Sequence, residues 1–131
     1  MALTRDREAV PTAAIDWPTV CVVIPTRGRP ELVRQSVQSV VDQDYEGQVD
    51  ILVVHDHEEP QQELATLARP GRQITLLTNT RSEGLAGSRN TGLDHTSASF
   101  VASCDDDDFW DASKLRLQMQ RMADAGIQCC G

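Results

Sequence analysis

The chain has 131 residues, 40% of them hydrophobic, and a formal net charge of −8 at pH 7 with an isoelectric point near 4.7. This length and composition predict one folded domain with a single core. The negative charge disfavours nucleic acid and anionic membrane surfaces as main partners, because both would repel the chain. The sequence contains no apolar segment of the length that a signal peptide or a membrane span needs, so the default location is the cytoplasm.

The first elements follow a polar N-terminal stretch. Residues 1–18 are expected to form a mobile leader, and residues 19–131 the folded part. Residues 20–24 are a continuous, mostly β-branched run, which predicts a strand buried on both faces. After the loop 26–30, apolar residues at helical spacing predict a helix over 32–41.

Strands and helices then alternate through the rest of the chain. Apolar and β-branched runs predict further strands, and periodic segments predict further helices: strands at 49–54, 74–77, 100–103 and 127–130, and helices at 61–68, 85–98 and 114–123. Gly87 and Gly92 are expected to be weak points of the helix 85–98. The alternation predicts a Rossmann-like, doubly wound, mostly parallel α/β sheet, whose ligands bind beyond the carboxyl ends of the strands.

Four adjacent aspartates, at positions 105–108, directly follow the strand predicted at 100–103. Neighbouring carboxylates repel one another and resist desolvation, so a cation or a phosphate-bearing partner would relieve the cost of placing them there. Mg²⁺ and Mn²⁺ prefer oxygen ligands, and Mg²⁺ is commonly held by one or two carboxylates together with substrate phosphates. We therefore expect Mg²⁺ or Mn²⁺ between this acidic run and a diphosphate. The alternative is a solvated acidic turn before a helix.

Two other polar loops, at 26–29 and 55–59, also follow predicted strands. In a right-handed parallel sheet these loops and the acidic run lie at one edge, so a nucleotide can lie across them with its diphosphate at the metal.

Four segments of the chain carry a family resemblance. They are residues 22–30, 51–56, 84–92 and 100–110 followed by Lys114 and Leu115. In this order they resemble the successive signatures of family-2 inverting glycosyltransferases of the GT-A fold, over about residues 20–131. The resemblance implies a truncated GT-A domain that carries the nucleotide-sugar-binding part of the enzyme. Such an enzyme transfers a sugar from a nucleotide diphosphate donor to an acceptor hydroxyl, and the sequence leaves donor base, sugar and acceptor open.

The resemblance also implies roles for particular residues. In the family, the Pro-Thr loop and the second Asp after the second strand hold the base, which places Pro25, Thr26 and Asp56 there. The D-x-D element falls on Asp105 and Asp107, with Asp107 as a metal ligand and Asp105 near the ribose, the diphosphate and the metal.

Three further residues are nucleotide-binding candidates. The fourfold run leaves the register of D-x-D open, so Asp106 is a candidate for the same role. Arg29 belongs to the first polar loop, and Arg89 matches an Arg-Asn pair of the family; either cation suits a phosphate. Arg89 could equally pair with the acidic run and relieve its repulsion.

The chain departs from the family pattern after the second strand. His55 stands where the family commonly has an Asp, and His57-Glu58 replace a small Gly-Ser turn. A second metal site on His55, Asp56 and His57 is disfavoured, because alternating residues at a strand end point to opposite sides.

The family's catalytic base and acceptor-binding residues are expected downstream of Gly131. The chain alone is therefore expected to transfer little sugar and to self-associate through exposed apolar surface. Were it active alone, Asp56, Glu58 and Asp111 would be the first candidates for the general base.

Two other functions remain open at this point. The first is a non-catalytic nucleotide-sugar-binding module, which binds the donor without transferring the sugar. The second, remote, is a phosphohydrolase of the haloacid dehalogenase type, which also places D-x-D after a buried strand. That resemblance is weaker, because Phe109 occupies a position usually given to Thr or Val and the motif lies late in the chain.

Overall fold

The computed structural model describes residues 17–79 and 81–125. Its centre is a parallel four-stranded sheet with the strand order β4–β3–β2–β5. The strands are β2 (Val20–Thr26), β3 (Val49–Asp56), β4 (Arg72–Asn79) and β5 (Phe100–Ser103). The helices are α1 (Pro30–Val41), η1 (Gln62–Leu67), α2 (Leu85–Asp94) and α3 (Lys114–Ala125).

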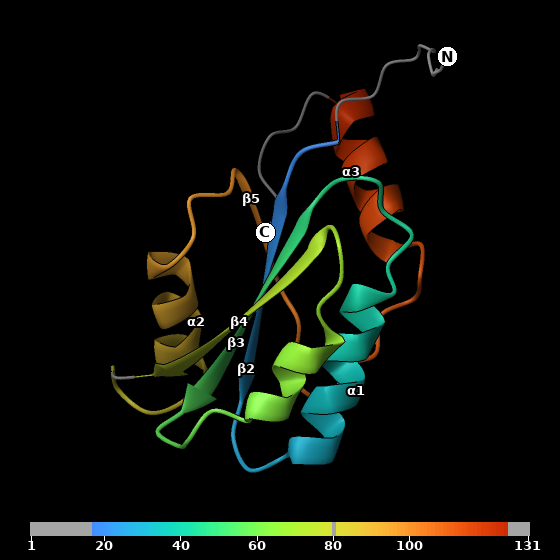
Figure 1. Ribbon diagram of the computed structural model, residues 1–131. Coiled ribbons are helices and arrows are strands. Elements are labelled where there is room, and N and C mark those ends of the chain that lie inside the picture. The colour runs from blue at the N-terminus through green and yellow to red at the C-terminus, as the bar shows by residue number, and fades with distance from the viewer. Residues whose placement is uncertain (1–16, 80, 126–131) are drawn as a thin grey trace.

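The helices cover both faces of the sheet. Helices α1, α3 and η1 lie on one face and α2 lies on the other (Figure 1). The predicted doubly wound, mostly parallel α/β sheet is therefore confirmed.

Alternate side chains of β2 build the two halves of the core. Val22 and Ile24 pack in one cluster with apolar residues of α1 and α3, whereas Cys21 and Val23 pack in a second cluster with Leu52 on the face covered by α2. This period of two is the geometry of a strand buried on both faces. Burying a side chain of this size stabilises the fold by about 1.5–3 kcal/mol, so the two clusters fix where α1 and α2 lie relative to the end of β2.

The glycines of α2 allow close packing and do not interrupt the helix. A Cβ at Gly87 would lie 2.0 Å from the carbonyl oxygen of Ser82, and a Cβ at Gly92 would lie 2.6 Å from Val23 Cγ1. Both positions therefore require glycine for the observed approach. Besides the expected weakening of the helix, which stays a prediction, the two glycines let α2 dock against the sheet and its own preceding loop.

Most strands and helices extend about two residues beyond their predicted ranges, and two elements differ more. The segment predicted as a helix over 61–68 is the short 3₁₀-helix η1, closed by hydrogen bonds between residues three apart, such as Leu64 N–H to Gln61 O. Helix α2 ends at Asp94, four residues before the predicted end. The His95 side chain lies 2.8 Å from the carbonyl oxygen of Thr91 and caps the last turn there.

Two predicted segments cannot be compared with the structure. The strand predicted at 127–130 and the leader up to residue 16 lie outside the described residues. No helix in the described part of the chain is long and apolar enough to cross a membrane.

The strand order creates a crevice at the end of β2. The chain passes from β2 to β3 on one side and returns to pair β5 with β2 on the other side. The place where the strand order reverses in this way is the topological switch point of the sheet. The loops on its two sides diverge, and ligands of open α/β sheets bind between them. The switch point here lies beside Thr26, the last residue of β2.

Candidate functional site

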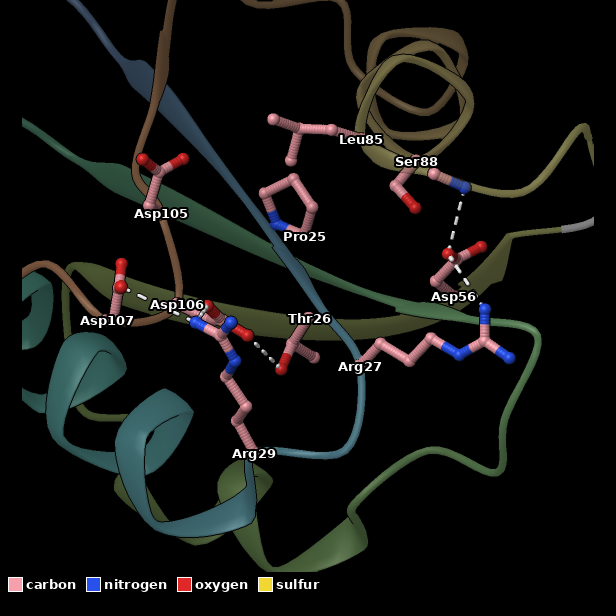
Figure 2. Close-up of a pocket in the computed structure, with 11 residues that line it drawn as sticks. Pro25, Thr26, Arg27, Arg29, Asp56, Leu85, Ser88, Asp105, Asp106 and Asp107 are labelled. Carbon is pink, nitrogen blue, oxygen red and sulfur yellow. Dashed lines mark hydrogen bonds and ion pairs between the residues drawn. The ribbon is translucent and has the colours of Figure 1, made fainter.

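A pocket with a volume of about 320 Å³ lies at the carboxyl ends of β2, β3 and β5 (Figure 2). Its lining comes from the loops after these strands and from the start of α2: Pro25, Thr26, Arg27, Arg29, Asp56, Gly84, Leu85, Ser88, Asp105, Asp106 and Asp107. Pockets for small molecules begin at about this size. The structure thus brings together all the nucleotide and metal candidates except Arg89, which does not line the pocket.

Asp106 points into the protein. It is 9% exposed, and its carboxylate accepts a hydrogen bond of 2.9 Å from Thr26 Oγ1. The side chains of Asp105 and Asp107 are 52% and 53% exposed. The four aspartates are therefore unequal: Asp106 joins the acidic run to the end of β2, and the residues on either side of it present carboxylates to the pocket.

Ser36 of α1 holds the backbone of the acidic run. Its fully buried Oγ lies 3.3, 2.8 and 2.6 Å from the carbonyl oxygens of Asp105, Asp106 and Asp108. The Asp108 N–H donates to the Asp105 carbonyl at 3.0 Å, which closes a turn around the serine. The Ser36 hydroxyl thus stabilises the turn in which the Asp105 and Asp107 side chains are exposed and the Asp106 side chain is buried.

Two arginines pair with the acidic run. Arg29 Nη1 lies 3.3 Å from an oxygen of Asp106 and 3.4 Å from an oxygen of Asp107. Arg89 Nη2 lies 3.8 Å from an oxygen of Asp105, and its Nε donates to Ser103 Oγ at 3.1 Å. Both guanidinium groups are about half exposed, so these pairs contribute little to stability but offset the repulsion among the carboxylates.

Asp56 fixes the other end of the pocket. Its carboxylate accepts a hydrogen bond of 2.8 Å from Asn79 Nδ2 and one of 2.9 Å from the Gly84 N–H, the N-cap of α2. Desolvation by burial raises the pKa of this carboxyl, but these two hydrogen bonds and the nearby His57 and Arg27 outweigh it, so the pKa lies below its ordinary value. Asp56 is therefore ionised at neutral pH and can accept a further N–H from a ligand.

The residue that replaces the family's first Asp is an internal histidine. His55 is buried; its Nδ1 lies 3.2 Å from the Leu77 carbonyl oxygen, and its Nε2 accepts the Gln61 N–H at 3.0 Å. Burial lowers the pKa of His55 more than the hydrogen bond to Leu77 and the charge of Glu58 raise it. Both ring nitrogens of the neutral imidazole are thus engaged within the protein.

His57 takes the place of a glycine in the turn that follows. Its φ of 54° lies in the left-handed region, which a glycine enters without steric cost. Its Nε2 lies 2.8 Å from the Arg81 carbonyl oxygen, on the loop that leads into α2. This contact holds the two loops on the Asp56 side of the pocket together.

The donor set at the acidic end fits a hard divalent cation that keeps other oxygen ligands. Within residues 17–79 and 81–125, no group of three or more His, Cys, Asp and Glu side chains is arranged to hold a metal ion. The carboxylates of Asp105 and Asp107 are half exposed, and one or two such carboxylates are what Mg²⁺ usually takes from a protein when phosphate oxygens and water complete its shell.

Sequence reasoning missed four residues of the pocket lining. They are Arg27, Gly84, Leu85 and Ser88. Gly84 is the N-cap of α2, and Leu85 and Ser88 lie at its start. The helical spacing of Leu85 and Ser88 puts both on one face, which is a signal that the sequence contained. Nothing in the sequence indicated that this face turns toward the strand ends and not toward solvent.

Solved structures share the fold of this chain. A mannosyltransferase from Pyrobaculum calidifontis, in complex with GDP-Man and Mn²⁺, superposes with a TM-score of 0.72 at 24% identity over 82% of this chain and 33% of that chain. The S. aureus protein TarS, residues 1–349, in complex with UDP, superposes with a TM-score of 0.70 at 18% identity, over 81% of this chain and 32% of that chain. These likenesses confirm the GT-A type of fold.

Curated relatives are glycosyltransferases. A UDP-Glc:alpha-D-GlcNAc-diphosphoundecaprenol beta-1,3-glucosyltransferase of Escherichia coli is 34% identical over 103 residues, which cover 79% of this chain and 40% of the relative. A GalNAc(5)-diNAcBac-PP-undecaprenol beta-1,3-glucosyltransferase of Campylobacter jejuni is 29% identical over 107 residues, which cover 79% of this chain and 34% of the relative. The chain spans two fifths or less of the length of these two relatives. The model of glycosyl transferase family 2 matches residues 21–131, and the chain belongs to that family.

Proposed function

We propose that this chain binds the nucleotide diphosphate sugar donor of a glycosyltransferase, with Mg²⁺ or Mn²⁺ between its aspartates and the diphosphate. The observation that carries the proposal is the division of the pocket into two unlike ends. Asp105 and Asp107 present half-exposed carboxylates at one end, the hydrogen-bonded Asp56 lies at the other, and Pro25 and Leu85 lie between them (Figure 2). A nucleotide has the same division, with a charged diphosphate and a flat base.

At the acidic end, Asp107 and Asp105 are the proposed metal ligands. When bound, the ion would neutralise charge on the departing nucleoside diphosphate. Asp106 keeps its hydrogen bond to Thr26 and acts by holding the turn. Arg29 Nη1 lies 3.4 Å from a carboxylate oxygen of Asp107. When Asp107 binds the ion instead, Arg29 is close enough to contact a phosphate of the donor.

From the middle of the pocket to Asp56, the proposed nucleoside site combines apolar and polar surface (Figure 2). Pro25 and the half-exposed Leu85 offer a surface against which a base can lie, and Asp56 offers an ionised acceptor for a base N–H. Arg89 lies outside this lining and pairs with Asp105, so its proposed part is to position the acidic run.

The relatives support a nucleotide-sugar donor and leave its base open. The names of the E. coli and P. calidifontis proteins give UDP-Glc and GDP-Man, and the latter structure also holds Mn²⁺. We propose the donor class on this ground, together with the pocket. The haloacid dehalogenase hypothesis loses its support with the family assignment.

The enzyme and the non-catalytic binding module differ in whether the sugar leaves the nucleotide. The proposal covers donor binding and activation of the leaving group, and gives no described residue the role of general base. Metal-assisted release of the nucleoside diphosphate to water does not need that base, so slow hydrolysis is expected of the enzyme and not of the module.

The test is chromatographic. The chain is incubated with UDP-Glc, UDP-GlcNAc or GDP-Man and Mn²⁺, and free UDP or GDP is measured against time. If the parent chain releases UDP or GDP and the Asp107→Asn variant does not, the result supports the enzyme. Metal-dependent binding without release supports the binding module, and the absence of both contradicts the proposed function.

A further inference from the structure

Ser88 of α2 is a buried hydroxyl without a partner. The residue is fully buried, and of the side-chain nitrogen and oxygen atoms buried in the described ranges, its Oγ is the one that makes no hydrogen bond. Leaving a buried hydroxyl unpaired costs stability, and most native structures avoid it. The neighbouring buried hydroxyl on the same helix, that of Thr91, lies 2.9 Å from Asn79 Oδ1 and 3.0 Å from the Gly87 carbonyl oxygen.

The unpaired hydroxyl lies at the nucleoside end of the pocket. Ser88 lines the pocket one turn after Leu85, at the start of a ten-residue helix. Figure 2 shows its side chain directed from α2 toward Asp56, on the side of the pocket away from Asp105 and Asp107. An unpaired buried polar group in a native structure calls for an explanation, and at a binding pocket a ligand atom can supply the missing partner.

We propose that Ser88 is a specificity residue whose hydroxyl hydrogen-bonds the base of the nucleotide donor. The inference rests on the proposed function, since it takes the acidic end as the place of the diphosphate. The hydroxyl is covered in this structure, so the side chains over it have to shift when the base enters. Together, Asp56 and Ser88 then present an acceptor and a donor to one edge of the base.

This pair selects for a particular chemistry. The ionised carboxylate of Asp56 accepts an N–H, and the hydroxyl of Ser88 donates to a carbonyl oxygen. Uracil and guanine each carry a ring N–H beside a carbonyl group. Cytosine and adenine have an unprotonated ring nitrogen in place of this N–H. In the position that uracil or guanine would take, that nitrogen faces the carboxylate and the amino group faces the hydroxyl, so these bases match the pair only after a shift of one atom along their edge. The preferred donors are therefore nucleotides whose base has adjacent N–H and C=O groups.

The decisive variant is Ser88→Ala, which removes one oxygen atom and leaves the backbone unchanged. Because the hydroxyl is unpaired in the empty protein, its removal should leave the melting temperature unchanged or raise it by about 2–5 °C. The same change should weaken Mn²⁺-dependent binding of UDP, or of GDP if that is the preferred nucleotide, by about five- to tenfold. The ratio of the affinities of the variant for UDP and CDP, or for GDP and ADP, should fall by a similar factor.

Thr96→Val is the matched control. Thr96 is a partly buried residue after α2 whose hydroxyl accepts a hydrogen bond of 3.1 Å from the Ala98 N–H, and it lies outside the pocket lining. This variant loses a satisfied hydroxyl, so its melting temperature should fall while its nucleotide affinity stays that of the parent chain.

Three results would overturn the inference. If Ser88→Ala binds UDP and GDP as the parent does, with the same discrimination against CDP and ADP, Ser88 does not read the base, and the proposed function stands. If its melting temperature falls together with its affinity, the hydroxyl is structural. If the parent chain binds neither UDP nor GDP in the presence of Mn²⁺, the proposed function itself fails and this inference with it.

Discussion

Thr26, the last residue of β2, donates a hydrogen bond of 2.9 Å to the carboxylate of Asp106, 80 residues further along the chain. Strand β5 pairs with β2 only as far as Val23, so the chain beyond β5 leaves the sheet and returns to β2 at this contact. The hydrogen bond therefore joins the end of β2, which carries Pro25 of the proposed nucleoside site, to the loop after β5, which carries the proposed metal ligands.

Thr26→Val should destabilise the chain, because it leaves a mostly buried carboxylate without its hydroxyl partner. The expected loss in free energy of unfolding is about 1–3 kcal/mol, measured by urea denaturation. Thr26→Ser keeps the hydroxyl and serves as the control, with stability close to that of the parent. Equal stability of the valine and serine variants would show that the contact contributes nothing.

Asp107→Asn and Asp107→Ala should abolish Mn²⁺-dependent nucleotide binding without lowering stability in the absence of metal. Asp107 is half exposed, and the loss of one of four crowded carboxylates relieves repulsion. The melting temperature of the metal-free variants should equal or exceed that of the parent. The control is Asp108→Asn, since Asp108 does not line the pocket and this variant should bind normally. A clear drop in melting temperature on changing Asp107 would instead make the acidic run structural.

Ser36→Ala should destabilise the turn formed by residues 105–108. Three carbonyl oxygens converge on the Ser36 hydroxyl, and the variant leaves them without its hydrogen, at a cost of about 1–3 kcal/mol in unfolding free energy. Because Asp105 and Asp107 depend on this turn for their placement, the Mn²⁺ concentration needed for half-maximal nucleotide binding should rise.

The control for this position is Ser39→Ala on the same helix. Ser39 Oγ accepts the Trp110 N–H at 3.1 Å and contacts no carbonyl oxygen of the acidic run. It should lose stability with an unchanged Mn²⁺ requirement. Equal Mn²⁺ requirements for both variants would contradict a positioning role of Ser36.

The strands were predictable and the orientation of the aspartates was not. Runs such as Val20 to Ile24 are recognisable because strands buried on both faces lack polar positions. The inward direction of Asp106, by contrast, depends on how far β5 pairs along β2 and on a serine of α1, which are relationships between distant residues. The close approach at Gly87 was unpredictable for a similar reason, since the backbone that approaches it comes from the loop before its own helix.

Stability should fall as the pH is lowered below about 6.5, the ordinary pKa of a histidine. Burial holds the pKa of His55 below that value, so between the two pKa values the unfolded chain binds more protons than the folded one. The stability given by neutral His55 is thus full above the unfolded pKa and declines until the folded pKa is reached. Asp56, whose pKa is also lowered, contributes a separate loss below about pH 4.

The measurement is urea denaturation at a series of pH values from 5 to 8. In His55→Gln the slope between neutral pH and pH 5 should be smaller than in the parent, whatever the absolute stability of the variant. An identical slope in both proteins would show that the decline has another origin.

The proposed function requires that a nucleoside diphosphate be held through a metal ion at the acidic run. Calorimetric titration of the chain with UDP and with GDP, once with Mn²⁺ and once with a chelator, tests this claim. We predict binding of at least one of the two nucleotides with Mn²⁺ and little or none with the chelator, because without the cation the phosphates face the carboxylates of Asp105 and Asp107. Equal affinity in both conditions would contradict the metal bridge.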